Sequence, residues 1–367
     1  MTRNCSDVVV VPNGFSCAAY PERMRIGVMT SGGDCPGLNA VIRAIVRKTE
    51  KVHGGTVLGF RDAWRGVLDD DFEELDIERC RGILPRGGTI LGTSRIQPYQ
   101  FGDGVTRVAD AMRRHQLDGF VVIGGDGSLG AARDLMADGI ACIGVPKTID
   151  NDISATEMTF GFDTAVHVAT SAIDRLHTTA EAHDRVMVVE VMGRNTGHIA
   201  VRAGLAGGAT LTLIPEVPFQ IEEICDALTR RHAGNKFASI LVVAEGAQPA
   251  VGSMAAAKYE VDRFGHERLG GIGQVLASEV EGRTGLETRV TTLGYVQRGG
   301  TPTAFDRILA TRFGVAAADA AAEGDWGKMV ALQSDTICRV ELAAAVNQRK
   351  TVDLDFYEQV VTPFFAG

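Results

Sequence analysis

The chain has 367 residues, of which 45% are hydrophobic and 23% are charged, and its formal net charge is −9. This length is enough for two α/β domains, and the composition is ordinary for a soluble globular protein. The acidic balance excludes broad binding to nucleic acids or to anionic membranes, because such partners require a basic surface. The seven cysteines include no CxxC pair, and no run of 18 apolar residues occurs, so we expect a cytoplasmic protein without a disulfide framework.

The N-terminal 23 residues contain a single short apolar run, residues 8–11, which Pro12 and Gly14 interrupt. That run is too short for a signal sequence or for a membrane span. We therefore expect residues 1–23 to be a leader outside the fold.

The first regular pattern is a strand at residues 25–30, which leads through a glycine-containing turn into an amphipathic helix at residues 39–48. The turn lacks the GxGxxG spacing of a dinucleotide-binding fold and the GK[ST] of a P-loop. It is either a backbone cradle for phosphate or a plain turn between a strand and a helix. A second loop, residues 86–95, is rich in glycine and hydroxyl side chains and has Arg at both ends, and Arg side chains can bridge phosphates.

The most informative stretch covers residues 120–153, which predict a strand, a helix and a second strand. Residues 120–123 and 141–145 are apolar runs, and residues 128–138 between them have helical spacing. A crossover of this kind makes the two strands parallel, so both carboxyl ends lie on one rim, where open α/β sheets bind ligands. This rim is therefore the expected position of a binding site.

Acidic side chains follow both strands of this unit. Asp126 lies among glycines whose backbone amides can approach an anion, and Ser128 is expected to open the following helix, whose N-terminus favours phosphate. Because a carboxylate cannot bind phosphate itself, we expect Asp126 to hold Mg²⁺. Asp150 and Asp152 point the same way if their turn is extended, and one of them can then accept a hydroxyl proton. A metal, an anion cradle and a base are the parts that phosphoryl transfer requires, although either turn alone is also compatible with a structural role.

The C-terminal half repeats the alternation of helices and strands and predicts a second doubly wound sheet. Helices are expected at residues 164–177, 221–231, 269–279 and from 304, and strands at residues 186–191, 209–214, 239–244 and 289–293. Strand-end residues are expected to line one rim of this sheet and to bind a phosphorylated polar ligand, namely Arg194, Glu245, Arg289 and Arg298.

The chain resembles the 6-phosphofructokinase family from about Arg25 to the C-terminal region. The resemblance is carried by six stretches in order, GVMTSGGDCPGLNAVIR, RGGTILGTSR, IGGDGSLGA, PKTIDNDI, VVEVMGR and ETRVTTLGYVQRGGTPTAFDR. It implies an α/β fold of two doubly wound, mainly parallel sheet domains with the active site in the cleft between them. Residues 24–161 and about 297–347 would form the nucleotide-binding domain, and residues 162–296 and about 348–367 the sugar-phosphate-binding domain.

The resemblance also implies an activity, the transfer of the γ-phosphoryl group of ATP to the 1-hydroxyl of fructose 6-phosphate in glycolysis. The residues that would bind the nucleotide are Gly33, Arg95, Ile96, Gly125, Asp126, Gly127, Ser128 and Lys147, with Asp126 at Mg²⁺. The catalytic residues would be Asp150 as the base, Thr148, Asp152, Arg194 and Arg95. The residues that would bind the sugar phosphate are Thr148, Ile149, Asp150, Arg185, Met192, Gly193, Arg194, Glu245, Arg289, Tyr295, Val296, Gln297 and Arg298. Arg185 and Arg289 match residues that reach in from a neighbouring subunit, which implies a homo-oligomer, a tetramer or a dimer.

Asp150 must be ionised to take the hydroxyl proton, and we expect nearby Mg²⁺ and Arg charges to keep its pKa low. Arg95 and Arg194 could neutralise the phosphoryl oxygens during transfer.

The choice of phosphoryl donor depends on two positions where the family varies. Gly127 is typical of ATP-dependent members and leaves room for the rest of ATP, whereas Lys147 is typical of pyrophosphate-dependent relatives and supplies an ammonium group for a phosphate. We prefer ATP, with pyrophosphate as the alternative. A further alternative is a sensor that binds a nucleotide or a sugar phosphate without catalysis, and another sugar phosphate, such as sedoheptulose 7-phosphate, also remains open as the acceptor.

Overall fold

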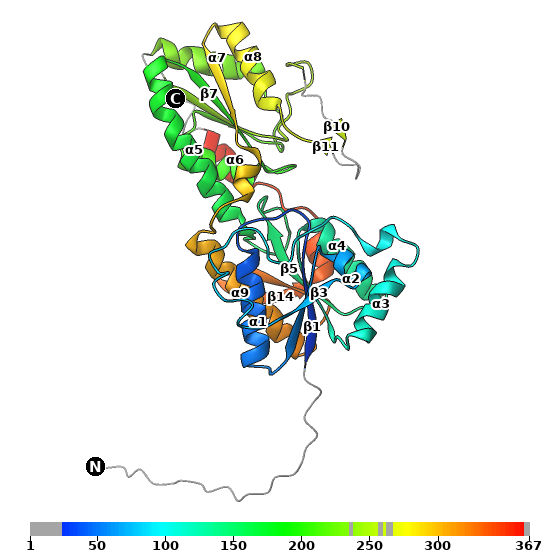
Figure 1. The fold of residues 1–367 in the computed structure, drawn as a ribbon. Coiled ribbons are helices and arrows are strands. Elements are labelled where there is room, and N and C mark those ends of the chain that lie inside the picture. Colours follow the sequence, from blue (N-terminus) through cyan, green and yellow to red (C-terminus); the bar gives the residue numbers. More distant parts are fainter. Residues whose placement is uncertain (1–23, 235–237, 256–259, 262–266, 363–367) are drawn as a thin grey trace, which may run out of the picture.

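The computed structural model describes residues 24–234, 238–255, 260–261 and 267–362 of the chain. The leader predicted at residues 1–23 lies outside the described residues, as do residues 363–367 at the C-terminal end. Figure 1 shows two lobes, each built around a sheet with helices on both sides. We call them the first lobe, which contains β1, and the second lobe, which contains β7.

The sheet of the first lobe is mainly parallel. Its strand order is β14 (Thr336–Glu341), β13 (Lys328–Gln333), β5 (Cys142–Thr148), β4 (Gly119–Gly124), β1 (Arg25–Ser31), β2 (Thr56–Phe60) and β3 (Phe72–Leu75), and β6 (Phe160–Gly161) pairs with the end of β5. The strands from β13 to β2 run parallel, whereas the edge strands β14 and β3 are antiparallel to their neighbours. The strands β1, β4 and β5 therefore end at one edge of the sheet.

Helices cover both faces of this sheet, which explains why its central strands are apolar throughout. On one face lie α1 (Leu38–Lys51) and α9 (Ala304–Ala322), and on the other α2 (Trp64–Asp69), α3 (Gly104–Arg114), α4 (Asp126–Ala137) and α10 (Leu342–Val346). Successive residues of β4 alternate between the two cores, since Val121 and Ile123 pack with α1 and α9 while Phe120 and Val122 pack with the other helices. Because helices cover both faces, the acidic turns project from the edge of the sheet where β4 and β5 end.

The second sheet has four parallel strands, in the order β12 (Thr288–Thr292), β7 (Val186–Val191), β9 (Ser239–Ala244) and β8 (Leu211–Leu213). On one face are α5 (Phe162–His183) and α6 (His198–Ala206), and on the other α7 (Ile221–Ala233) and α8 (Ile272–Thr284). The remaining described elements are short. They are the 3₁₀ helices η1 (Pro98–Gln100) and η2 (Gly294–Arg298), the two-residue strands β10 (Glu260–Val261) and β11 (Glu267–Arg268), α11 (Leu354–Phe356) and the π-helical turn η3 (Tyr357–Val361).

The predicted α/β fold with mainly parallel sheets is confirmed, and most element boundaries agree within three residues. Several predicted boundaries are displaced. The strand predicted to end at Val145 continues through Pro146 to Thr148, where the missing N–H of proline is tolerated because it lies at the last pair with β4, Gly124 with Pro146. The helix predicted from residue 128 begins at Asp126. The helix predicted to end at residue 177 continues to His183, and the helix predicted to end at residue 279 continues to Thr284.

The chain passes between the lobes more than once. Residues 25–161 and 328–341 supply the strands of the first sheet, and residues 186–292 supply those of the second. At the C-terminal end, the Tyr357 hydroxyl donates a hydrogen bond to the carbonyl of Thr212 at 2.7 Å, which holds η3 against the second lobe. Within the described ranges, none of the helices combines the length and apolarity that a transmembrane segment needs.

Candidate active site

A cavity of about 610 Å³ lies where β1, β4 and β5 end, and it extends to the turn after β7 in the second lobe. We call it the main cavity. The predicted site residues that line it are Gly33, Arg95, Gly125, Asp126, Gly127, Ser128, Lys147, Thr148, Ile149, Asp150, Asp152, Arg194 and Arg298. The predicted nucleotide, metal and base positions are thus brought together at one edge of the sheet, with residues of both lobes in the wall.

The turn after β1 forms one wall of the main cavity. Gly32 has a φ of 83°, a conformation that only glycine adopts freely, and its N–H donates to the carbonyl of Ser94 at 3.0 Å. A Cβ at Gly33 would lie 2.5 Å from Nη1 of Arg298, so the close approach of Arg298 requires glycine there. Beneath this turn, the buried Lys147 donates a hydrogen bond from its ammonium group to the carbonyl of Gly33.

The turn after β4 forms a second wall. Gly125 is the N-cap of α4, and the carboxylate of Asp126 sits in the first turn of that helix, where the helix dipole favours negative charge. Ser128 donates to the hydroxyl of Ser31 at 2.9 Å, which joins this turn to the end of β1. Among the described residues, no hydrogen bond or ion pair involves the Asp126 carboxylate, and its side chain is exposed at the cavity.

The turn after β5 carries the predicted base. The N–H of Asp150 donates to Oγ1 of Thr148 at 3.0 Å, and Asn151 has a φ of 53°. The turn is therefore not extended, which was the condition for Asp150 and Asp152 to point the same way. Both side chains nevertheless line the main cavity.

The pKa of Asp150 differs from the expectation. Burial and the neighbouring charge of Asp152 raise the pKa of Asp150 to about 7, while Arg298 and Arg194 lower it by less. The expectation of a low pKa for Asp150 is therefore wrong as far as the protein's own charges are concerned. The desolvation of its carboxylate outweighs the effect of the two guanidinium groups. Burial also lowers the pKa of Lys147 and raises the pKa of Asp152.

The second lobe contributes the turn after β7. The backbone N–H of Arg194 donates to Oε1 of Glu245 at 3.1 Å, and Thr196 donates from its hydroxyl to the carbonyl of Asp150 at 3.4 Å. Burial raises the pKa of Glu245. The Thr196 contact ties the turn after β7 to the turn that carries Asp150, so the two lobes meet at the predicted base.

Other predicted residues lie near the main cavity without lining it. Ile96 lines an adjoining cavity of about 740 Å³, which shares Gly32, Gly33, Asp34, Arg95 and Arg298 with the main cavity. Tyr295 and Val296 are exposed on η2, and the guanidinium of Arg298 lies 5.5 Å from the centre of the Tyr295 ring. The remaining three, Met192, Gly193 and Gln297, are buried in the turns behind the wall.

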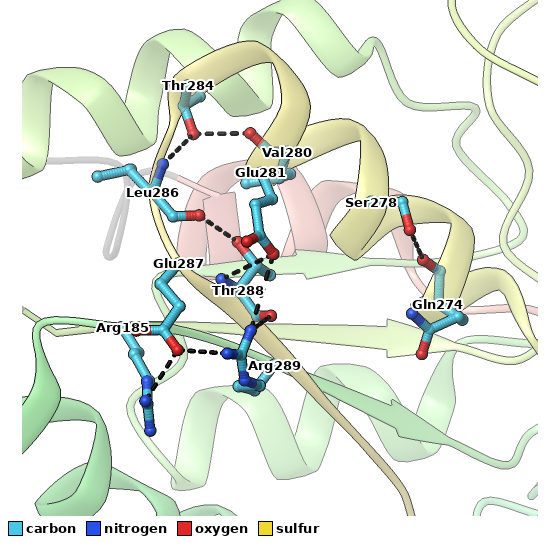
Figure 2. A network of polar contacts seen from close by, with 10 residues as sticks. All are labelled: Arg185, Gln274, Ser278, Val280, Glu281, Thr284, Leu286, Glu287, Thr288 and Arg289. Atoms are coloured by element: carbon cyan, nitrogen blue, oxygen red, sulfur yellow. Dashed lines mark hydrogen bonds and ion pairs between the residues drawn. The ribbon is translucent and has the colours of Figure 1, made fainter.

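Arg185 and Arg289 lie elsewhere, at the end of the second sheet where β7 and β12 begin. Arg289 pairs in register with Met187 near the start of β7, whereas Arg194 follows the end of that strand. The prediction that Arg289 lines the same rim as Arg194 is therefore wrong. Figure 2 shows Arg185 and Arg289 both directed at Glu287, which accepts from Arg185 at 2.8 Å and from Arg289, and Arg185 is the main cause that lowers the pKa of Glu287.

Several residues of the main cavity were not singled out from the sequence, namely Ser31, Gly32, Asp34, Gln97, Gln100, Asn195 and Arg349. Three of them, Ser31, Gly32 and Asp34, belong to the glycine-containing turn after the first predicted strand. That turn is the sequence feature that could have identified them. Nothing in the sequence pattern around Arg349 marks it, because it reaches the site from a C-terminal segment almost 200 residues after Asp152.

The wall of the main cavity combines cationic side chains with carboxylates. Five cationic side chains can bind phosphate oxygens, namely Arg95, Lys147, Arg194, Arg298 and Arg349. Asp126 supplies an exposed carboxylate, and Asp150 supplies a candidate base. Fold and site together define a two-lobed α/β protein whose cleft is suited to phosphoryl transfer between polyanionic ligands.

Comparison with known proteins gives the family. The family model described as Phosphofructokinase matches residues 25–321, so the chain belongs to the phosphofructokinase family, and it is an enzyme of this kind. It is 56% identical over 338 residues to the pyrophosphate–fructose 6-phosphate 1-phosphotransferase of Streptomyces coelicolor, with 92% of this chain and 98% of that protein covered. It is 54% identical over 329 residues to ATP-dependent 6-phosphofructokinase 3 of the same organism, with 90% and 96% covered.

Solved structures give the same family. The phosphofructokinase of Pichia pastoris matches with a TM-score of 0.77 and 30% identity over 90% of this chain. The match covers 36% of the Pichia chain, so this protein spans about a third of that chain but nearly the whole of its two Streptomyces relatives.

Proposed function

We propose that this enzyme transfers the γ-phosphoryl group of ATP to the 1-hydroxyl of fructose 6-phosphate, with Asp150 as the general base, to give fructose 1,6-bisphosphate and ADP. The observation that carries the proposal is the presence of Asp126 and Asp150 in one cavity, on the turns that follow the neighbouring strands β4 and β5. The names of the relatives support fructose 6-phosphate as the acceptor. The first lobe would bind the donor and the second lobe the sugar phosphate.

The protein's own groups have distinct tasks in this scheme. Asp150 takes the proton from the acceptor hydroxyl, and its pKa of about 7 places it near the operating pH, which is favourable for general-base catalysis. Arg95 and Arg194 neutralise charge on the transferred group from opposite lobes, and Arg298 approaches Gly33 closely enough to hold the same oxygens.

A magnesium ion fits the donor side of the cavity. Asp126 is an exposed carboxylate without a protein partner in the described ranges, and Mg²⁺ is usually held by one or two carboxylates together with phosphate oxygens and water. No group of three or more His, Cys, Asp or Glu side chains suited to a metal ion occurs among the described residues. When bound, Mg²⁺ would neutralise charge on the donor phosphates.

ATP is favoured as the donor by the space beside Gly127. A Cβ at Gly127 would meet only Nε2 of Gln97, at 3.6 Å, so the wall is open there. The adjoining cavity with Ile96 in its wall then offers room for the ribose and base of a nucleotide, whereas pyrophosphate would need only the main cavity.

Pyrophosphate is the second candidate donor, and Lys147 favours it. The ammonium group of this residue lies in the wall of the main cavity beneath Gly33, where it can bind a terminal phosphate of a compact donor. The pyrophosphate-dependent name of the Streptomyces coelicolor relative with 56% identity also supports this alternative.

The test is a comparison of donors with the purified full chain. Fructose 1,6-bisphosphate is measured after incubation with fructose 6-phosphate, Mg²⁺ and either ATP or pyrophosphate, at several concentrations of each donor. A higher kcat/KM with ATP supports the proposal, and a higher value with pyrophosphate supports the alternative. Binding of fructose 6-phosphate without product from either donor would favour a non-catalytic sensor, and parallel reactions with sedoheptulose 7-phosphate test the acceptor.

A further inference from the structure

A short C-terminal segment, residues 348–352, passes behind the turn that carries Asp150. Arg349 forms an antiparallel bridge with Ile153, and the N–H of Lys350 donates to the carbonyl of Asp152 at 2.9 Å. The hydroxyl of Ser154 donates to the carbonyl of Gln348 at 2.5 Å. We call residues 348–352 the C-terminal strap, because its backbone runs alongside the residues that follow the candidate base.

The side chain of Lys350 makes the most concentrated set of contacts in the strap. Its ammonium group donates at 2.9 Å to each of three acceptors, Oδ1 of Asn151 and the carbonyls of Thr156 and Glu157. All three N–H donors of the ammonium group therefore have an acceptor. Burial lowers the pKa of Lys350 to about 8, so the group is still mainly charged at neutral pH.

Asn151 receives this contact at a strained position. It lies between Asp150 and Asp152, it is 4% exposed, and its φ of 53° is uncommon for a residue other than glycine. Its Oδ1 also accepts from the N–H of Thr159 at 3.0 Å. Such a backbone conformation persists where the surroundings hold it. Here the Asn151 side chain is held by the Lys350 ammonium group, by the amide and hydroxyl of Thr159, and by the carbonyl of Glu157, to which its Nδ2 donates at 3.4 Å.

We propose that Lys350 is a positioning residue for the reaction, which holds Asn151 in its left-handed conformation and thereby keeps the Asp150 and Asp152 carboxyl groups in the main cavity. The proposal rests on the role of Asp150 in the proposed function. Arg349, the neighbour of Lys350, lies in the wall of the main cavity with its Nε 4.0 Å from Oδ2 of Asp152, so the strap reaches the site directly as well.

The strap has anchors that do not involve the Lys350 ammonium group. The N–H of Val352 donates to Oε1 of Glu216 at 3.0 Å, and Nε2 of His198 lies 3.2 Å from the carbonyl of Lys350. The Val352 side chain is buried. Loss of the ammonium group should therefore leave the strap docked on the second lobe and loosen mainly the turn around Asn151.

The test compares Lys350→Met with a matched control, Lys328→Met, whose ammonium group pairs with Glu341 between β13 and the edge strand β14. Because small displacements of a catalytic group are costly, we expect Lys350→Met to lower kcat by on the order of 10²-fold. We expect the dissociation constant of fructose 6-phosphate to change less than about threefold, since the binding side chains remain. The control should keep wild-type kcat.

A double-mutant cycle identifies the route of the effect. Asn151→Gly retains a left-handed backbone but removes the acceptor of the Lys350 contact. It should lower kcat at least as much as Lys350→Met, and the two changes together should cost less than the sum of the two single losses, because the Lys350–Asn151 contact is absent in both variants. Asn151→Gly also tests the proposal independently if Lys350→Met fails to fold.

Three results would overturn the proposal. One is wild-type kcat in folded Lys350→Met, the second is unchanged kcat in Asn151→Gly, and the third is additive losses in the double mutant. The wild-type enzyme, assayed in parallel, separates this question from the proposed function. If it makes no fructose 1,6-bisphosphate with either donor, the proposed function fails first, whereas an active wild type with a fully active Lys350→Met contradicts the positioning role alone.

Discussion

Asp150 and Asp152 share one cavity across a residue with left-handed backbone, Asn151, and the charge of Asp152 raises the pKa of Asp150. Two carboxylates in one partly desolvated site resist simultaneous ionisation, so the proton affinity of either depends on the other. The same pair therefore sets both the strength of the candidate base and the pH range in which it is ionised.

The first prediction concerns the pH dependence of the rate. Because Asp150 must be ionised to act as a base and its pKa is raised to about 7, kcat/KM should fall as the pH decreases through 7. Replacing Asp152 with Asn removes a charge that raises this pKa, so the acidic limb of the profile should move to lower pH. The measurement is kcat/KM for fructose 6-phosphate from pH 5.5 to 9, in about half-unit steps. An acidic limb that does not move in Asp152→Asn would contradict the coupling.

The second prediction concerns stability. The pKa of Asp150 is higher in the folded protein, at about 7, than its ordinary value of 3.8. The folded state therefore holds a proton that the unfolded chain releases, so this group makes the protein less stable as the pH rises from about 4 to about 7. Asp150→Asn removes the buried charge and should raise Tm at pH 8 by more than at pH 4. Thermal unfolding at both pH values provides the measurement, and an equal shift at the two would count against the raised pKa.

The third prediction tests the donor through Gly127. An Asp side chain there would enter the open space beside Gln97 and face the donor phosphates. Since two like charges about 4 Å apart near a protein surface repel by a few kcal/mol, kcat/KM for ATP should fall by on the order of 10²-fold in Gly127→Asp. Activity with pyrophosphate should be affected less, because this shorter donor has no nucleoside part to occupy the space beside Gly127. Gly130→Asp, on the same helix and outside the cavity wall, provides the control.

The fourth prediction concerns Arg185 and Arg289. Both bind Glu287 (Figure 2), and they lie at the end of the second sheet away from the main cavity, so any site that they serve would belong to a neighbouring copy of the chain. Asp150→Ser and Arg289→Ala should each be nearly inactive alone at low fructose 6-phosphate. If subunits exchange after mixing, activity should recover to about a quarter of wild type, because half of the random pairs are hybrids and each hybrid has one intact site of two. Failure to recover in a mixture shown to contain hybrids would exclude the shared site.

The sequence predicted the central part of the fold and the acidic turns well, for a physical reason. β4, β5, β7 and β9 are buried on both faces, so they read as continuous apolar runs, and the acidic turns after the first two mark the edge where the candidate site lies. β3 and α2 were not predicted, because they are short and their exposed residues obscure any periodicity.

The site was less predictable where it depends on position within a strand or on distant segments. Arg289 was grouped with residues that follow strand ends, although the predicted strand, residues 289–293, begins with it. It is the second residue of β12, so it lies at the end of the sheet opposite Arg194. The pKa of Asp150 depends on burial, which a motif does not reveal. Arg349 and Lys350 reach the Asp150 turn only through tertiary structure, so no local pattern could identify them.

The most direct test of the account is the effect of Asp150→Ser on turnover and on binding, measured separately. If Asp150 is the general base, kcat should fall by on the order of 10²- to 10⁴-fold, while calorimetric binding of fructose 6-phosphate changes little. Near-normal kcat in this variant, with either ATP or pyrophosphate, would contradict the assignment of Asp150.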